Sequence, residues 1–151
     1  MTHRSTTAFA ALLLAACKPA TPIAPDISVR DGWARETAPG QTSGAAYVTI
    51  VSRGSAGDRL VGVTTPAASS AMLHASSESG GVMSMRMAKE VAVPGGATVA
   101  LKPLGTHIML TGLTAPLKTG DRVSLTLRFA RAGERQVDAA VLAASASGPT
   151  R

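Results

Sequence analysis

Turn signals recur at short intervals along this chain, and they constrain its fold more than any other feature of the sequence. Fifteen glycines and nine prolines interrupt 151 residues, and the stretches between them are short and rich in Val, Leu, Ile and Thr. In residues 121–129 (DRVSLTLRF) every second residue is apolar: Val123, Leu125, Leu127 and Phe129. Such alternation is typical of a strand with one buried face. The pattern predicts an all-β fold, an antiparallel sandwich or barrel of about eight or nine short strands.

The expected strands form one domain with a short segment on either side. We place the domain at residues 29–143. Its expected strands are 45–51, 59–64, 71–75, 82–87, 89–94, 97–103, 106–113, 121–129 and 136–142. Residues 76–81 (SSESGG) and 104–107 are expected to form loops at the rim of the fold. The chain has two phenylalanines, one tyrosine and one tryptophan, so its core must be mainly aliphatic, and Trp33 is assigned to the core or to an interface.

The first residues have the layout of a bacterial export signal. Residues 1–16 combine a short basic start with an apolar run too short to span a bilayer. The run ends in LAAC, which resembles a lipobox, so Cys17 is expected to carry a lipid and become the new N-terminus. Residues 17–28 would tether the domain, and residues 144–151 would form a disordered tail. This interpretation predicts a periplasmic, membrane-anchored lipoprotein; the alternative is an ordinary cleaved signal that happens to contain a cysteine.

Positive charge is in excess but is not concentrated. Fifteen Lys and Arg residues compare with nine Asp and Glu residues, and the formal net charge is +6. The basic residues are scattered, without a run of like charges and without interleaved aromatic residues, which argues against nucleic acid as a partner of an exported protein. Attraction to an anionic surface or to an acidic protein stays open.

Methionine and histidine are grouped in three of the expected strands. Apart from Met1 and His3, the residues of these two types are Met72 with His74, then Met83, Met85 and Met87, then His107 with Met109. Residues i and i+2 of a strand point to the same side, so the members of each group share one face. Methionine is also a flexible core filler, and a small metal site needs only three or four donors. Some of the seven therefore belong to the core, Met72 and Met87 before the others.

Thioether sulfur and imidazole nitrogen together favour Cu(I). Soft thioethers select Cu(I) among the biological metals, and imidazole also suits copper. Zinc is usually bound by thiolate, imidazole or carboxylate, and Cys17 is the only cysteine. Because a thioether has no proton to lose and does not depend on thiol redox state, such a site can hold Cu(I) in an oxidising compartment.

The spacing of four of these residues carries a family resemblance. Ten residues separate His74 from Met85, twenty-one separate Met85 from His107, and one separates His107 from Met109. This arrangement resembles the motif of the periplasmic PCuAC copper chaperones. The surrounding text is similar too, with GVMSMR before a Pro-Gly-Gly turn and LKPLGTHIMLTGL after it. The resemblance covers about residues 29–142.

Membership of that family would imply a cupredoxin-like Greek-key β-sandwich without the blue-copper ligand set. It would also imply one Cu(I) per chain, held at a solvent-accessible site by His74, Met85, His107 and Met109, with Met83 and Met72 as candidate auxiliary ligands. The family's role implies delivery of copper to the CuA centre of cytochrome c oxidase, in cooperation with a thiol-containing Sco-type protein. The tail ASASGPTR contains no His or Met, unlike the Cu(II)-binding extension of some members.

The expected function is therefore that of an extracytoplasmic metallochaperone, which captures Cu(I) and passes it on by ligand exchange. It is not expected to be an enzyme, because its carboxylates show no catalytic spacing. Two rival hypotheses remain: a copper-dependent redox enzyme, and a structural surface lipoprotein that fills its core with methionine and binds no metal.

Overall fold

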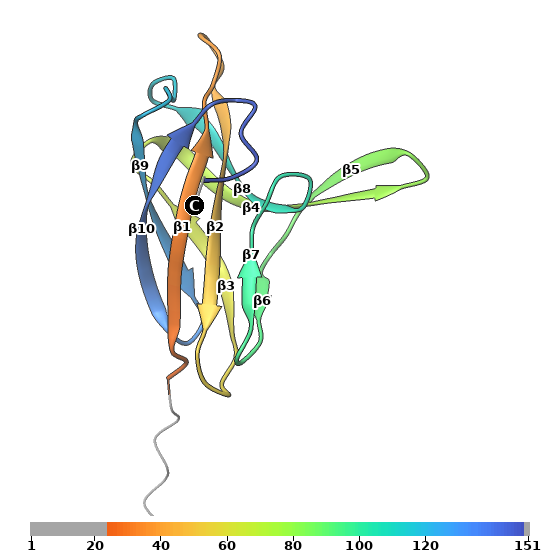
Figure 1. Ribbon diagram of the computed structural model, residues 1–151, viewed down its shortest axis with the longest axis vertical. Coiled ribbons are helices and arrows are strands. Elements are labelled where there is room, and N and C mark those ends of the chain that lie inside the picture. The colour runs from red at the N-terminus through yellow and green to blue at the C-terminus, as the bar shows by residue number, and fades with distance from the viewer. Residues whose placement is uncertain (1–23, 150–151) are drawn as a thin grey trace, which may run out of the picture.

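Ten β-strands account for most of residues 24–149, the part of the chain that the computed structural model describes (Figure 1). They are β1 (Ile27–Arg35), β2 (Ser43–Ser52), β3 (Asp58–Thr64), β4 (Ala68–Ser79), β5 (Val82–Met87), β6 (Val91–Val93), β7 (Thr98–Ala100), β8 (Thr106–Leu113), β9 (Arg122–Phe129) and β10 (Gly133–Leu142). The expected signal peptide, the expected lipidation of Cys17 and most of the tether lie outside the described residues. Within that range no helix has the length and apolarity needed to cross a membrane.

One continuous hydrogen-bonded sheet contains all ten strands and folds over into a β-sandwich. Its order is β5-β4-β8-β2-β1-β10-β9-β3-β6, with β7 paired to β2. β1 and β10 are parallel, and the other pairs are antiparallel. The three strands that carry the methionines and histidines, β5, β4 and β8, are therefore consecutive at one end of the sheet.

The core between the layers is mainly aliphatic, as the composition predicts. All four apolar residues of the alternating pattern in β9 are buried, which confirms that strand and its orientation. Trp33 is also buried, and its ring stacks on that of Tyr47 with the centroids 4.3 Å apart. The assignment of Trp33 to the core is confirmed.

The residue pattern does not predict the first strand, although the family resemblance places DGWAR (31–35) among the leading strands. β1 begins at Ile27, two residues before the expected start of the domain at 29, and it supplies the tenth strand. Its pairing with β2 shifts between Arg30 and Trp33, and Asp31 adopts a positive φ of 52°. This bulge interrupts the period-two alternation on which strand prediction relies, so the segment does not show a strand pattern.

The expected loop at 76–81 is also wrong. β4 continues to Ser79, and only Gly80 and Gly81 form the turn, with φ values of 59° and 78°. Positive φ at both central residues is the requirement of a two-residue type I′ hairpin. Ser and Glu resemble loop residues because this part of the hairpin packs against no core. At the second expected loop, 104–107, Thr106 and His107 already belong to β8.

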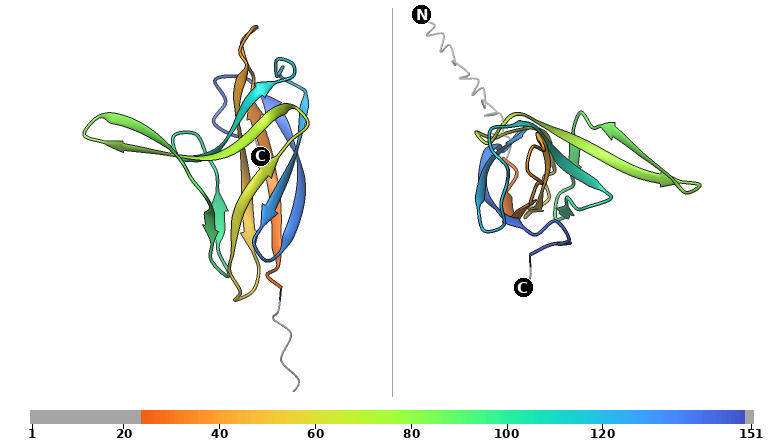
Figure 2. Two further views of the ribbon diagram at one scale, coloured as in Figure 1. Left: turned by 180° about the vertical axis from the view of Figure 1, so that it is seen from behind. Right: turned by 90° about the horizontal axis from the view of Figure 1, so that it is seen from above.

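The β4–β5 hairpin projects from the body of the sandwich as an arm, which Figures 1 and 2 show from three directions. We use "arm" for residues 76–87. All six residues of β5 are exposed. The arm thus holds its side chains in a regular strand register while leaving them open to solvent.

A buried carboxylate ties the opposite end of the sheet together. Asp58 is buried at the start of β3 and accepts hydrogen bonds from three backbone N–H groups: those of Arg59 (2.7 Å), Arg131 (3.0 Å) and Ala132 (2.7 Å). The last two belong to the β9–β10 turn. Asp58 therefore anchors that turn to β3, and removing the carboxylate would remove all three of these hydrogen bonds.

We expect Asp58→Ala to lower the free energy of unfolding by roughly 3 kcal/mol, because three hydrogen bonds to a buried charged group are lost together. Urea denaturation followed by circular dichroism measures this change. Glu134→Ala is the control: this carboxylate is exposed on the neighbouring strand β10, and its loss should change the stability by less than about 0.5 kcal/mol. Equal effects of the two substitutions would contradict the anchoring role.

Candidate metal centre

The register of three strands brings the methionines and histidines onto one face. On β4, His74 lies opposite His107 of β8 on one side and opposite Met87 of β5 on the other. In the neighbouring rows, Met72 lies opposite Met109. The arm continues the same face, with Ser76 opposite Met85 and Glu78 opposite Met83. Directly opposite residues of antiparallel strands share a face, so all seven residues predicted from the sequence share this one.

His107 is the most constrained donor of this face. Its side chain is 6% exposed, and its Nδ1 donates a hydrogen bond of 3.0 Å to the carbonyl oxygen of Gly105. A carbonyl only accepts, so the proton is on Nδ1 and the lone pair is on Nε2. The same carbonyl also accepts the backbone N–H of Ser76 at 3.3 Å. One oxygen therefore fixes the ring of His107 and attaches the base of the arm, in the way outer groups orient metal-binding histidines.

His74 sits beside His107 and has an unsatisfied ring nitrogen. The two ring centroids are 5.9 Å apart, with the planes inclined at 57°. If both rings bound one metal ion, each metal–nitrogen bond would be about 2 Å long. Two such bonds and the radii of the two rings together span roughly the distance between the centroids. Nδ1 of His74 is buried without a hydrogen-bond partner in the described structure. Leaving such a group unpaired costs about 1–3 kcal/mol, a cost that a bound metal ion would remove.

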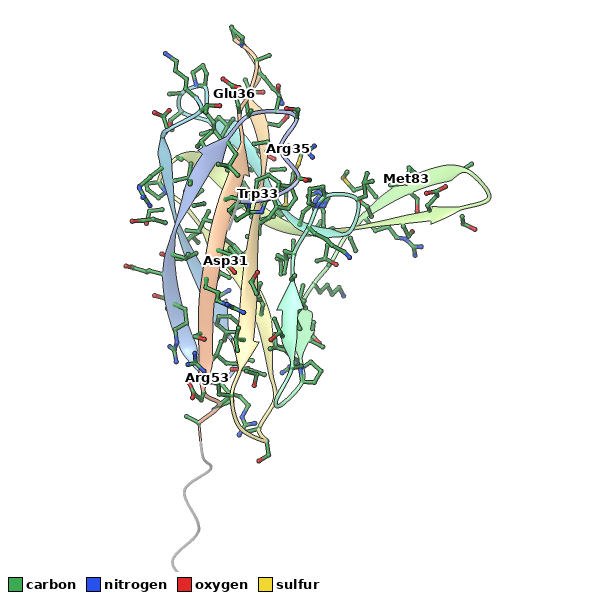
Figure 3. All side chains as sticks on the ribbon, in the orientation of Figure 1. Asp31, Trp33, Arg35, Glu36, Arg53 and Met83 are labelled. Carbon is green, nitrogen blue, oxygen red and sulfur yellow. The ribbon has the colours of Figure 1, made fainter. Side chains whose placement is uncertain are left out.

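Thioethers and the His107 ring meet in a surface groove of about 840 Å³. Met83, Met85, His107 and Met109 all line it, so three of the four expected ligands are together there with one auxiliary candidate. Figure 3 shows Met83 on the projecting arm. The fourth expected ligand, His74, does not line the groove but adjoins it through the ring of His107.

The two methionines assigned first to the core have different environments. Met87 is 67% exposed on the arm, so its assignment to the core is wrong; β5 has no core to pack against. Met72 is half-buried on the face of the donors and does not line the groove. Met85, by contrast, is 56% exposed and lines the groove.

Arg35 and part of segment 144–149 also line the groove, where no sequence pattern predicts them. Arg35 lines the groove and donates from Nη2 to the carbonyl oxygen of Ala146 at 3.1 Å. Ala144 and Ser147 also line it. Residues 144–149, expected to be a disordered tail, thus fold back beside the donors. Their small polar composition gives no periodic signal that could have shown this.

An aromatic row leads from the core to the site. Trp33 stacks on Tyr47, and the Tyr47 ring centroid lies 6.4 Å from that of His107. Burial raises the pKa of the Tyr47 hydroxyl, and the nearby Arg35 cation lowers it by a smaller amount. Tyr47 therefore connects the rigid core to the wall of the groove.

The donor set is soft. In the part of the chain that the structure describes, no three His, Cys, Asp or Glu side chains lie together as a metal site would need. Two imidazoles and several thioethers are the ligands that this face presents, and this combination suits Cu(I) better than zinc or a hard cation. Fold and site together define a small β-sandwich with one face of soft His and Met side chains.

Comparison with known proteins agrees with that class. The family model described as "Putative lipoprotein LpqE-like" matches residues 27–141. The chain belongs to this family, the PCuAC family, as its motif suggested. A curated relative, "Putative lipoprotein Lxx21020" of Leifsonia xyli subsp. xyli, is 40% identical over 104 residues. That match covers 68% of this chain and 61% of the relative, so the chain spans less than two thirds of the relative's length.

Two solved structures share the fold. The copper-bound PCuAC domain from PmoF2 has a TM-score of 0.67 and 27% identity, covering 80% of this chain and 95% of that domain. The Cu(I)-DR1885 solution structure from Deinococcus radiodurans has a TM-score of 0.63 and 34% identity, covering 81% of this chain and 82% of that protein. The expected cupredoxin-like Greek-key β-sandwich is confirmed.

The environment of Tyr47 can be measured directly, because it is the only tyrosine in the chain. We expect the alkaline ultraviolet titration of the folded protein to have its midpoint above 10, since burial raises the pKa of this phenol. In Arg35→Gln the midpoint should rise further, because the cation that favours the phenolate is gone. The chain unfolded in guanidinium is the control and should titrate near 10. A native midpoint at or below that of the unfolded chain would contradict this description of the groove wall.

Proposed function

We propose that this protein is an exported Cu(I) carrier whose metal is held by His74, Met85, His107 and Met109. The observation that carries the proposal is the single face on which the β5-β4-β8 register collects two imidazoles and the thioethers. The family membership and the copper-bound relatives support it. Met83 and Met72 are auxiliary donors, the first in the groove and the second beside Met109.

The proposed donors are of two kinds: imidazoles fixed in the body of the protein and a thioether exposed on the arm. His107 is buried and oriented by the Gly105 carbonyl, and His74 lies against it. Met85 is on the exposed arm. The imidazoles would keep the ion in place while an incoming ligand replaces the thioether of Met85. All four donors are neutral when they bind, so the site keeps the ion's own charge of +1, and no carboxylate must be desolvated during transfer.

Copper carriage suits this site better than catalysis. A copper enzyme needs an open coordination position together with positioned acid or base groups. Glu78, the carboxylate on the arm's donor face, lies at its exposed end opposite Met83. The natural recipient would be an extracytoplasmic copper protein, such as the CuA subunit of cytochrome c oxidase or a thiol-containing Sco-type protein. A lipid on Cys17 would keep the carrier at the membrane where such recipients are found.

Anaerobic Cu(I) competition against a coloured chelator, with the chain from residue 18 onward, tests the proposal. We expect one Cu(I) per chain. Met85→Leu preserves the size of the side chain but removes the sulfur, so the affinity should fall about tenfold or more, equivalent to about 1.4 kcal/mol. Met109→Leu should act in the same direction.

The matched control is Val82→Ala. Val82 is exposed on the same strand as Met85 but on the opposite face, so its substitution should leave the Cu(I) affinity unchanged. A wild-type protein that does not compete with the chelator, or a Met85→Leu protein that competes equally well, would overturn the proposal. In the first case the structural lipoprotein hypothesis would replace it.

A further inference from the structure

The outer edge of β5 is an unprotected strand edge. β5 is at one end of the sheet order, and within residues 24–149 only β4 pairs with it. The pairing runs through all six residues without a bulge. Every second residue of an edge strand turns its N–H and C=O groups outward. The arm therefore presents a straight row of backbone donors and acceptors to solvent.

The opposite edge of the same sheet is protected. β6 has three residues, its Val93 is buried, and Pro94, which has no N–H, follows directly. Short length and a flanking proline are the usual means by which proteins prevent unwanted strand pairing. β5 has neither: it is twice as long, contains no proline, and exposes Val82, Met83, Met85 and Met87. One edge of the sheet is closed to partners and the other is open.

A strand added to this edge would place its side chains beside the copper donors. Side chains of an added strand alternate between the two faces of the sheet. In an antiparallel pair, the Cβ atoms of two directly opposite residues are about 4.5–5.5 Å apart. Residues opposite Met85 and Met87 would therefore share the donor face. The residue between them would face the other way, opposite Arg86, which is exposed.

We infer that the edge of β5 is the docking site for an extended segment of the copper acceptor, which adds as a further strand. The inference rests on the proposed function and identifies the chemistry of the partner. Soft donors, thioether or thiolate, would stand opposite Met85 and Met87, with a carboxylate between them opposite Arg86. Charge supports an acidic partner, since the chain carries a net +6 and Lys89 and Lys102 are exposed near the arm and the groove.

Such docking links recognition to transfer. Backbone pairing would hold the acceptor in one register, and its donors would lie beside Met85 while the imidazoles still hold the ion. The exchange of one ligand for another then occurs within one sheet, so no donor must approach from bulk solvent.

Synthetic peptides test the inference on the intact chain from residue 18 onward, metal-free and Cu(I)-loaded. The probe alternates threonine and valine, with methionine–glutamate–methionine at its centre. Two matched versions of this peptide carry N-methyl groups on alternate residues, one version on the odd-numbered and the other on the even-numbered residues. Each version therefore has one edge that cannot form backbone hydrogen bonds and one edge that can. We expect the parent peptide and one methylated version to bind and the other methylated version not to bind. Binding should shift the NMR signals of the β5 backbone amides.

Charge reversal at the arm is the second measurement. Arg86→Glu should weaken the parent peptide by about fivefold, because repulsion replaces an exposed ion pair. Arg53→Glu is the control, since this exposed arginine lies at the far end of the body (Figure 3) and should have no more than a small effect. Both variants should keep the Cu(I) affinity of the wild-type protein.

The outcomes separate this inference from the proposed function. Failure of the parent peptide to bind, equal binding by both methylated versions, or shifts outside the arm would overturn the docking site while leaving a normal Cu(I) titration intact. Peptide binding without any Cu(I) binding would overturn the proposed carrier and, with it, the acceptor as occupant. Concentration-dependent dimerisation through β5, detected by sedimentation and abolished by the peptide, would assign the edge to a second copy of this chain and overturn the acceptor assignment.

Discussion

The antiparallel pairing of β4 with β8 decides where both histidines, Met72 and Met109 point. Leu73 on β4 and Ile108 and Leu110 on β8 are buried in the core, and the donors occupy the alternate positions of the same strands. Because side chains alternate with a period of two, a one-residue slip would put donors into the core and leucines into the groove. The apolar residues that stabilise the sandwich therefore also fix the register of His74 and His107. Fold stability and site geometry depend on the same contacts.

This arrangement gives the face two different mechanical properties. Near the body, the Gly105 carbonyl holds both the His107 ring and the Ser76 backbone. Beyond Ser76, the hydrogen bonds that hold the arm within residues 24–149 are its own ladder and the exposed contacts of the Ser84 hydroxyl with the Ser77 hydroxyl (2.9 Å) and the Ser77 carbonyl (3.5 Å). A hairpin without core contacts has low local stability. The imidazoles are thus placed on the rigid part of the molecule and Met85 on the deformable part, which is a suitable division for a carrier that must release its ion.

Most of the strands were predictable from the sequence, and so was the grouping of the seven His and Met residues in three strands, because alternation and His/Met pairing are local patterns. β1 was not, since its bulge at Asp31 breaks the alternation. The arm was predicted as a loop at 76–81 followed by a strand at 82–87, because exposed strands need no apolar residues and composition alone cannot distinguish SSES in a ladder from SSES in a turn. The contributions of Arg35 and residues 144–149 to the groove depend on contacts between distant parts of the chain, which no local pattern encodes.

The arm exposes methionines on an unprotected edge, a combination that favours aggregation. Two features of the chain oppose it. Net positive charge makes copies of the protein repel one another, and Arg86 places a charge between Met85 and Met87 on the edge strand itself. Neither feature opposes an acidic strand. The same charges that discourage self-association therefore favour a partner of opposite charge. The edge of β5 can thus discriminate between an acidic strand and a second copy of this chain, although no other segment within residues 24–149 shields it.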